Sequence, residues 1–282
     1  MINWFLRFRV KNANTQQVAL KEVWQANKVL FSLFTRYGDT IIDLVIIREF
    51  IVKYPSKDYL ILCPRQMQPY VNELLPDVEC VALNKRNLWD MLSINHRLKQ
   101  WQPDVGFNPW SNGLDSCYFL TYCKHYQCYK NFDRSKEINH YQVVRRYLLL
   151  PEKPWRVEEL ILQDNYTKVV VCPQSTDSER SIAKERIDQL LADIKQNHQN
   201  VDITIAAMNQ SYFKDGCESF VFEKTADISQ RFIDLIKNSD LVISADSAPL
   251  HVAIALNKDV IGFFYITKPE IVLNTDTIIS YG

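Results

Sequence analysis

The chain has 282 residues, which is enough for two domains of ordinary size, each with its own core. Apolar residues make up 47% and charged residues 23%, a balance that is typical of a globular protein and excludes a disordered one. Basic and acidic residues are equal at 33 each, so no overall field attracts nucleic acid, and none is expected as a partner.

Residues 1–12, MINWFLRFRVKN, interleave large apolar side chains with basic ones. The segment is too short for a secretion signal and has no small-residue cleavage site. It either lies in the headgroup layer of an anionic membrane or packs against the first domain through side chains such as Trp4 and Phe5. No run of 18 apolar residues occurs in the chain, so no membrane span is expected.

Short apolar runs alternate with segments of helical period along the rest of the chain. In the first half, strands are predicted at Lys28–Phe34, Asp58–Cys63, Glu79–Leu83 and Val105–Asn108, and helices near Gln68–Leu75 and Leu88–Trp101. In the second half, strands are predicted at Lys168–Cys172, Asp202–Ala207, Phe220–Glu223, Leu241–Ala245 and Asp259–Phe264, and helices around Ile187–Ile194 and Ile228–Ile236. This order predicts an α/β fold with parallel sheets covered by helices on both faces.

The segment Ile41–Val52, IIDLVIIREFIV, is apolar and β-branched nearly all round, so that intrinsic propensity favours a strand. Its twelve residues are long for a strand, and it lies between two predicted strands. We therefore predict a buried helix here.

Residues Leu148–Thr167 contain two prolines, mixed charges and no sustained period, which is typical of a connection between domains. We place the boundary there and predict an N-terminal domain at residues 1–155 and a C-terminal domain at residues 156–282. Two α/β domains joined in this way leave a cleft between them, the usual place for a ligand.

The chain has seven cysteines and no C-x-x-C pair, a usage that suits reduced thiols in a cytoplasm. Their one cluster is Cys117, Cys123 and Cys128, with His125 nearby, and its spacing fits no usual zinc site. We interpret these as buried thiols and expect no metal. No G-x-G-x-x-G follows any strand, which argues against an NAD-dependent oxidoreductase, and no cofactor is expected.

Gly38 and Asp39 follow the first predicted strand, in the stretch FTRYGDTIID, although the chain has only six glycines. One interpretation is a tight turn with a solvated carboxylate. The other is a turn that presents Asp39 to a substrate. These residues by themselves leave both interpretations open.

The stretch DLVISADSAPLHVAIAL joins a strand to a helix through Asp246 and Ser247, and His251 lies in the first turn of that helix. Free backbone N–H groups and the helix dipole make such a turn an anion site, to which Ser247 and His251 can add donors. The alternative is that Asp246 caps the helix and His251 is a core histidine.

The stretch VVVCPQSTDSER offers a second anion site. Ser175 and Thr176 follow a predicted strand, and Arg180 precedes a helix. Hydroxyl groups and an arginine at such a turn suit a diphosphate, although ordinary capped helices have a similar composition.

Three of these patches together resemble glycosyltransferase family 9, typified by the lipopolysaccharide heptosyltransferases. That family has a Gly-Asp turn after its first strand, a Ser/Thr pair followed four residues later by a basic residue, and a D-[TS]-G-x-x-H turn near the end. The matching residues of this chain, in the same order, are Gly38 and Asp39, then Ser175 and Thr176 with Arg180, then Asp246, Ser247 and His251. Gln102–Asn112 also resembles a strand of the family, and the likeness extends from about Lys28 to Thr267.

The resemblance implies a GT-B architecture, in which two Rossmann-like domains with parallel sheets face each other across a cleft. The N-terminal domain would take the acceptor sugar and the C-terminal domain the nucleotide-sugar donor. By this likeness Asp39 is the general base on the acceptor hydroxyl, in a reaction that inverts the anomeric carbon. The donor would be held by Ser175, Thr176, Arg180, Asp246, Ser247 and His251. The chain has no D-x-D element, so transfer without a metal is expected.

The activity most simply implied is heptose transfer from ADP-heptose to a lipid-linked or oligosaccharide acceptor of a lipopolysaccharide core, at the inner face of the cytoplasmic membrane. The chain departs from the family pattern in three ways. Arg180 replaces the usual lysine, Ala248 replaces the usual glycine, and the chain stops at TIISYG, before the helical segments that usually close the family's chains. These departures leave open a different sugar or acceptor, such as a capsule, and a non-catalytic relative that binds a glycan or nucleotide.

Overall fold

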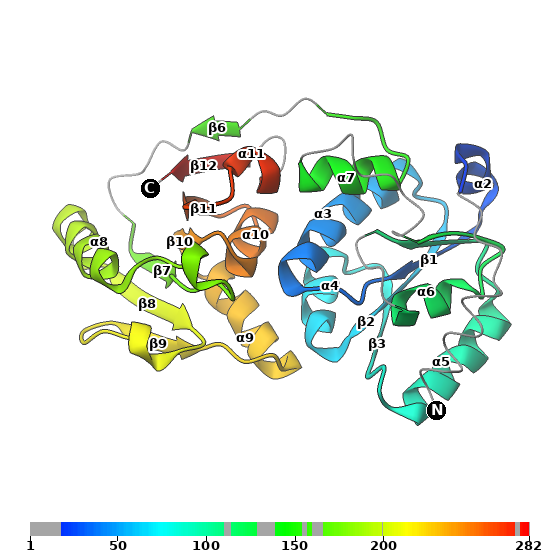
Figure 1. Cartoon of the computed structure of the whole chain (residues 1–282), viewed down its shortest axis with the longest axis horizontal. Coiled ribbons are helices and arrows are strands. Elements are labelled where there is room, and N and C mark those ends of the chain that lie inside the picture. The colour runs from blue at the N-terminus through cyan, green and yellow to red at the C-terminus, as the bar shows by residue number, and fades with distance from the viewer. Residues whose placement is uncertain are drawn as a thin grey trace. The chain divides into compact units, whose positions relative to one another are not determined.

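The computed structural model describes residues 18–109, 114–128, 139–153, 157–159, 166–198, 200–273 and 277–281. Residues 1–12, considered above as a membrane contact, lie outside the described residues. The chain divides into two compact units, Met1–Glu152 and Lys153–Gly282, and each is described by itself (Figure 1).

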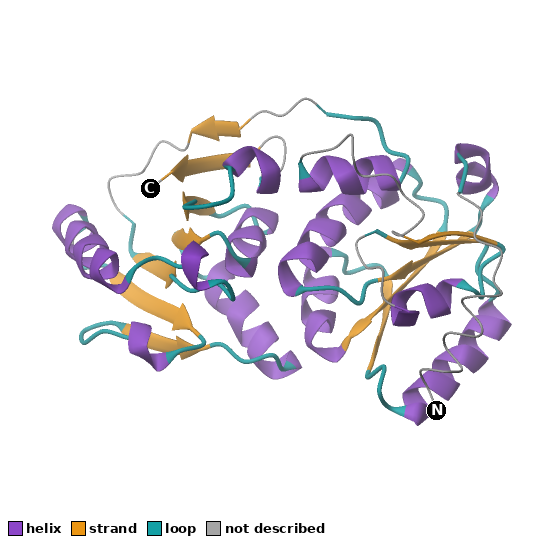
Figure 2. Cartoon of the chain, in the orientation of Figure 1, coloured by secondary structure: helices purple, strands orange, loops and turns teal. Residues whose placement is uncertain are grey.

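The first unit is built around a five-stranded parallel sheet with the strand order β3-β2-β1-β4-β5. Figure 2 shows its strands in orange with helices beside them. Its strands are β1 Lys28–Ser32, β2 Asp58–Pro64, β3 Glu79–Leu83, β4 Val105–Asn108 and β5 His125–Cys128. Its helices are α2 Leu20–Gln25, α3 Tyr37–Lys53, the 3₁₀ turn η1 Arg65–Met67, α4 Gln68–Leu74, α5 Leu88–Trp101, α6 Leu114–Leu120 and α7 His140–Tyr147.

Both faces of this sheet are covered, with α3 and α7 on one side and α5 and α6 on the other (Figure 1). Alternate residues of β1 face these two sides. Leu30 belongs to a buried cluster with Met91 and Leu98 of α5. The ring of Phe31 meets that of Phe50 on α3 edge-on, with 5.7 Å between the ring centroids. Burial on both faces explains why β1 is a continuous apolar run rather than an alternating one.

The second unit has a seven-stranded sheet with the order β6-β12-β11-β10-β7-β8-β9, and every neighbouring pair is parallel. Its strands are β6 Val157–Glu159, β7 Lys168–Cys172, β8 Asp202–Ala207, β9 Glu218–Val221, β10 Leu241–Ala245, β11 Asp259–Phe263 and β12 Thr277–Tyr281. Its helices are η3 Ser178–Arg180, α8 Lys184–Asn197, η4 Gln210–Tyr212, α9 Ala226–Lys237, α10 Ala248–Ala255 and α11 Pro269–Val272. Val169 and Val171 pack against Ile187 and Leu191 of α8, and α9 and α10 lie on the other face (Figure 1).

The predicted α/β class with parallel sheets is confirmed. The buried helix predicted at Ile41–Val52 is confirmed as part of α3, which begins earlier, at Tyr37. The strand predicted at Phe220–Glu223 is wrong by two residues, since β9 is Glu218–Val221. β9 is a largely exposed edge strand, so its apolar pattern is weak. β5 was not predicted as a strand, because polar side chains interrupt its short apolar pattern.

Candidate functional site

Asp39 lies in the first turn of α3, at the carboxyl end of β1. The hydroxyl of Thr35 donates a hydrogen bond to Asp39 Oδ2 over 3.5 Å. Asp39 is half-buried, and a carboxylate in the first turn is favoured by the helix dipole. The structure therefore holds Asp39 at the edge of the sheet with part of its surface accessible.

Gly38 does not make the tight turn that the sequence suggested. It is the second residue of α3, and among the described residues the only glycine with a positive φ is Gly216. The chain bends before the helix instead, at Thr35, and the extended residue Arg36 is the N-cap. The carbonyl of Arg36 accepts hydrogen bonds from the backbone N–H of Thr40 at 2.9 Å and from its hydroxyl at 3.0 Å, which starts the helix early.

Asp43 lies one turn after Asp39 on α3 and is only 1% exposed. Neither of its carboxyl oxygens has a hydrogen-bond partner within the described part of the chain. Burial raises the pKa of Asp43 well above its ordinary value, and the neighbouring charge of Asp39 raises it further. The protonated, neutral form of Asp43 is therefore favoured. Sequence reasoning passed over this residue, because it lies inside an apolar run.

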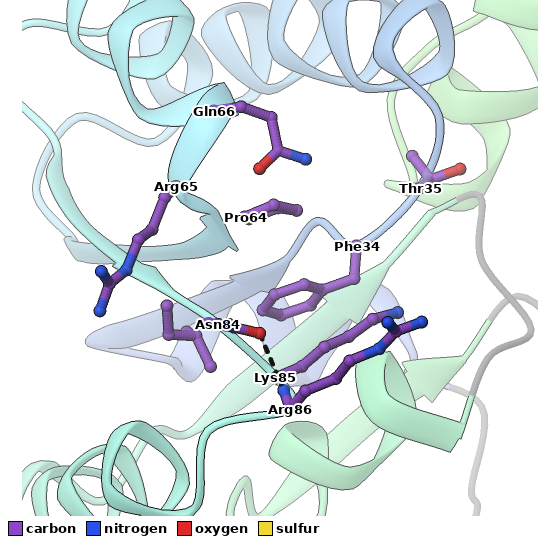
Figure 3. Close-up of a pocket in the computed structure, with 9 residues that line it drawn as sticks. Phe34, Thr35, Pro64, Arg65, Gln66, Asn84, Lys85 and Arg86 are labelled. Atoms are coloured by element: carbon purple, nitrogen blue, oxygen red, sulfur yellow. Dashed lines mark hydrogen bonds between the residues drawn. The ribbon is translucent and has the colours of Figure 1, made fainter. Parts of the chain in front are cut away.

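A cavity of about 460 Å³ lies at the carboxyl ends of β1, β2 and β3. Figure 3 shows the ring of Phe34 in its middle, with the side chains of Lys85 and Arg86 extending past the ring. Thr35, which donates to Asp39, also lines the cavity. The other lining residues are Pro64, Arg65, Gln66, Leu83 and Asn84. A ligand in this cavity would therefore lie close to Asp39.

Three cationic side chains line this cavity. Arg65 is paired with Asp90 at 3.1 Å, but its side chain is 62% exposed. Arg86 has no ion-pair partner among the residues that the structure describes, and its backbone N–H donates to Asn84 Oδ1 at 3.0 Å. With Lys85 beside it, the cavity favours an anionic ligand. The run NKR directly after a predicted strand was the signal that could have revealed it.

In the second unit, the loop after β7 folds around its own hydroxyl groups. Ser175 is buried, and its backbone N–H donates to the hydroxyl of Ser181 at 3.0 Å. The hydroxyl of Ser175 accepts from the backbone N–H of Asp177 at 3.4 Å. Thr176 is exposed. These contacts give the loop a defined shape and leave Thr176 accessible to a ligand.

Arg180, at the end of this loop, reaches the turn after β10. Its Nη1 lies 3.4 Å from Oδ2 of Asp246, which is 2% exposed, and its Nε lies 3.8 Å from Oδ2 of Asp177. The contact arises because β7 and β10 are neighbours in the sheet. Two of the predicted donor-binding motifs are thus brought together by their side chains.

The turn after β10 leads into α10, whose N-cap position is Ser247. Asp246 is therefore not the N-cap, contrary to the alternative interpretation of the sequence. The hydroxyl of Ser247 makes no cap hydrogen bond and donates instead to the carbonyl of Ala245 at 3.3 Å. His251 lies in α10 and is 5% exposed. Six predicted residues thus belong to the second unit, whereas Asp39 belongs to the first.

Metal ligands and membrane spans are considered for the described residues alone. Within them, no group of three or more histidine, cysteine, aspartate or glutamate side chains is placed to hold a metal ion. Cys117, Cys123 and Cys128 are buried there and form no disulfide. No helix in the same residues is long and apolar enough to cross a membrane.

The second unit matches the model of glycosyltransferase family 9 (heptosyltransferase) over residues 159–274. This range contains the turns of Arg180 and Asp246, but not Asp39. The predicted resemblance to family 9 is confirmed. No curated protein matches the sequence.

Solved structures match the fold of the chain beyond this range. The ADP-heptose lipopolysaccharide heptosyltransferase II of E. coli is 14% identical, with a TM-score of 0.67 over 90% of this chain and 92% of that one. A family 9 glycosyltransferase of Veillonella parvula is 14% identical, with a TM-score of 0.66 over 95% and 89%. The E. coli heptosyltransferase WaaC, solved with ADP, is 11% identical, with a TM-score of 0.64 over 90% and 93%.

At these identities the structural likeness shows the fold, which is the GT-B fold of glycosyltransferases. The family match in the second unit and this fold support glycosyltransferase activity.

Proposed function

We propose that the protein transfers a heptose from ADP-heptose to the core of a bacterial lipopolysaccharide or lipooligosaccharide, with inversion and without a metal. The observation that carries this proposal is the contact between Arg180 and Asp246. It joins two turns of the kind that bind diphosphates, inside the range that matches the family model.

The second unit would bind the donor. Arg180 is the cation of this site, and the buried carboxylate of Asp246 holds its guanidinium at the carboxyl edge of the sheet. Thr176 and Ser247 would donate hydrogen bonds to the diphosphate, and His251 would add a further donor. Such fixed donors stabilise the negative charge that develops on a leaving diphosphate. Support for an adenine nucleotide comes from the two E. coli heptosyltransferases, whose descriptions name ADP-heptose and ADP.

The first unit would bind the acceptor in the cavity beside Asp39. Its cations favour an acceptor that carries phosphate or carboxylate groups, as glycolipid cores do. The acceptor hydroxyl would point toward Asp39, whose carboxylate is steadied by Thr35. A carboxylate can act as a general base when it lies within hydrogen-bond distance of the hydroxyl whose proton it takes.

In the proposed reaction, Asp39 takes the proton of the acceptor hydroxyl while its oxygen attacks the anomeric carbon of the donor. The bond from that carbon to the diphosphate oxygen breaks, and the electron pair leaves with ADP. Arg180 and the donors around it stabilise the charge on ADP. Because attack comes from the side opposite the leaving group, the configuration at the anomeric carbon inverts.

A lipid-linked acceptor would be met at the inner face of the cytoplasmic membrane. Residues 1–12 have the aromatic and basic side chains for a peripheral contact there. The proposed location is therefore the cytoplasm, at the membrane surface.

The test of the proposal is a transfer assay with ADP-heptose and a delipidated core acceptor, with the product identified by mass spectrometry. UDP- and GDP-sugars serve as competing donors. A product one heptose heavier than the acceptor, formed from ADP-heptose alone, supports the proposal. Product formed only from another donor would still support a glycosyltransferase, but one that uses a different nucleotide-sugar.

One observation favours a second candidate, a protein that binds a nucleotide-sugar or glycan without transfer. Arg180 already has two carboxylates close by, from Asp246 and Asp177, and both compete with a phosphate for its guanidinium. Donor binding in calorimetry together with no product from any acceptor would favour this candidate.

A further inference from the structure

Helix α5 has two apolar faces, although a surface helix needs only one to pack on its domain. Its inner face is buried in the core of the first unit. The outward apolar residues, here called the α5 apolar surface, are Leu88 at 53% exposure, Trp89 at 76% and Leu92 at 49%. Helical spacing brings all three to one side of the helix. A cluster of large exposed apolar side chains marks an interaction surface.

Basic side chains flank the α5 apolar surface. Lys85 and Arg86 lie just before Asn87, the N-cap of α5, and are exposed. Lys99 is exposed seven residues after Leu92, on the same side of the helix. The one acidic residue in the first turn, Asp90, is already paired with Arg65. The chain as a whole carries no net charge, so this basic excess is local.

This composition fits the surface of an anionic bilayer better than it fits another protein. Tryptophan and leucine enter the boundary between headgroups and acyl chains, and lysine and arginine pair with anionic headgroups. A second copy of the chain would bring the same cations face to face, which opposes association through this surface.

The α5 apolar surface also adjoins the cavity of the proposed acceptor. Lys85 and Arg86 line that cavity (Figure 3), and α5 begins two residues after them. A membrane bound here would therefore lie at the rim of the cavity.

We propose that Leu88, Trp89 and Leu92, flanked by Lys85, Arg86 and Lys99, form a surface by which the first unit binds an anionic membrane. This goes beyond the contact proposed for residues 1–12, because it assigns binding to a folded helix. It rests on the proposed function only for its biological purpose, since membrane binding needs no transferase activity.

The test is sedimentation of the full chain with vesicles of phosphatidylglycerol and phosphatidylcholine, compared with vesicles of phosphatidylcholine alone. Trp89→Ser combined with Leu92→Ser should weaken partition to the anionic vesicles by about tenfold. Trp24→Ser is the matched control, because Trp24 is 69% exposed but lies on α2, before the amino end of β1. Its partition should equal that of wild type.

Two further measurements make the test decisive. Added salt should weaken partition of the wild type, because the flanking cations contribute. Melting temperature and transfer to a soluble acceptor should be unchanged in the double variant, since both side chains are exposed and neither lines the cavity.

Equal partition of wild type and the double variant would overturn the inference. Self-association of the wild type in light scattering that the double variant abolishes would assign the surface to a second copy instead. Sedimentation and light scattering do not depend on transferase activity, so each of these outcomes can be interpreted even if the transfer assay fails.

Discussion

The guanidinium of Arg180 meets the carboxylate of Asp246 at 3.4 Å, although 66 residues separate them in the sequence. The contact connects the loop after β7 with the turn before α10. It places a cation at the carboxyl ends of two neighbouring strands, and Asp246 restrains it there. A positioned cation of this kind is what a diphosphate site without a metal requires.

Arg180→Ala should weaken binding of ADP by about tenfold or more, because a hydrogen bond to a charged group contributes about 1.5 to 3 kcal/mol. Titration calorimetry with ADP at low salt measures the loss. Arg186→Ala is the control, since Arg186 is exposed on α8 and contacts only Gln189 in the hydrogen bonds described. Unchanged ADP affinity in the Arg180 variant would show that the donor site lies elsewhere.

Asp39→Asn should lower the rate of transfer by about 10² to 10⁴ and leave ADP affinity nearly unchanged. The amide keeps the shape of the carboxylate but cannot accept the proton of the acceptor hydroxyl. Single-turnover kinetics and calorimetry on the same preparation separate the two effects. A rate within a few-fold of wild type would remove Asp39 from the role of base.

Arg86→Ala should raise the KM for an acceptor that carries phosphate groups, with little change in ADP affinity, because Arg86 lines the cavity next to Asp39. The effect should shrink with added salt, as expected for an exposed cation. Arg97→Ala is the control, because Arg97 pairs with Glu79 and does not line the cavity. Equal KM values for the two variants would contradict binding of the acceptor in this cavity.

Asp43→Asn should make the protein more stable than wild type as the pH rises. Burial and the charge of Asp39 raise the pKa of Asp43 in the folded state, so the folded protein holds this proton more tightly than the unfolded chain. Wild-type stability is therefore fully present below the unfolded pKa, about 3.9, and falls as the pH rises toward the folded pKa. Asparagine does not ionise, so the stability of the variant does not fall in this way as the pH rises.

Urea unfolding at pH 5, 6.5 and 8 measures the difference between the two proteins. The gap should widen by up to about 1.4 kcal/mol per pH unit. Asp58→Asn is the control, because it makes the same chemical change at an exposed position. Parallel curves for wild type and the Asp43 variant would show that Asp43 is not protonated in the folded protein.

The sequence by itself determined the fold class and the strands buried on both faces of their sheets. β7 and β10 are largely apolar runs. Such strands can be recognised in the sequence because burial on both faces disfavours polar side chains. The segment Ile41–Val52 was also readable as a helix from its length and position. The edge strands β5 and β9 were missed or misplaced, because a strand that pairs on one side tolerates polar residues.

Only the tertiary structure decided which side chains meet. It brought Arg180 to Asp246 through the order of the strands, and it placed Gly38 inside a helix rather than in a turn. It also buried Asp43 one turn from Asp39 and gathered the cations of the cavity from separate loops. These relationships depend on packing between segments far apart in the chain, and local spacing and propensity carry no information about such packing.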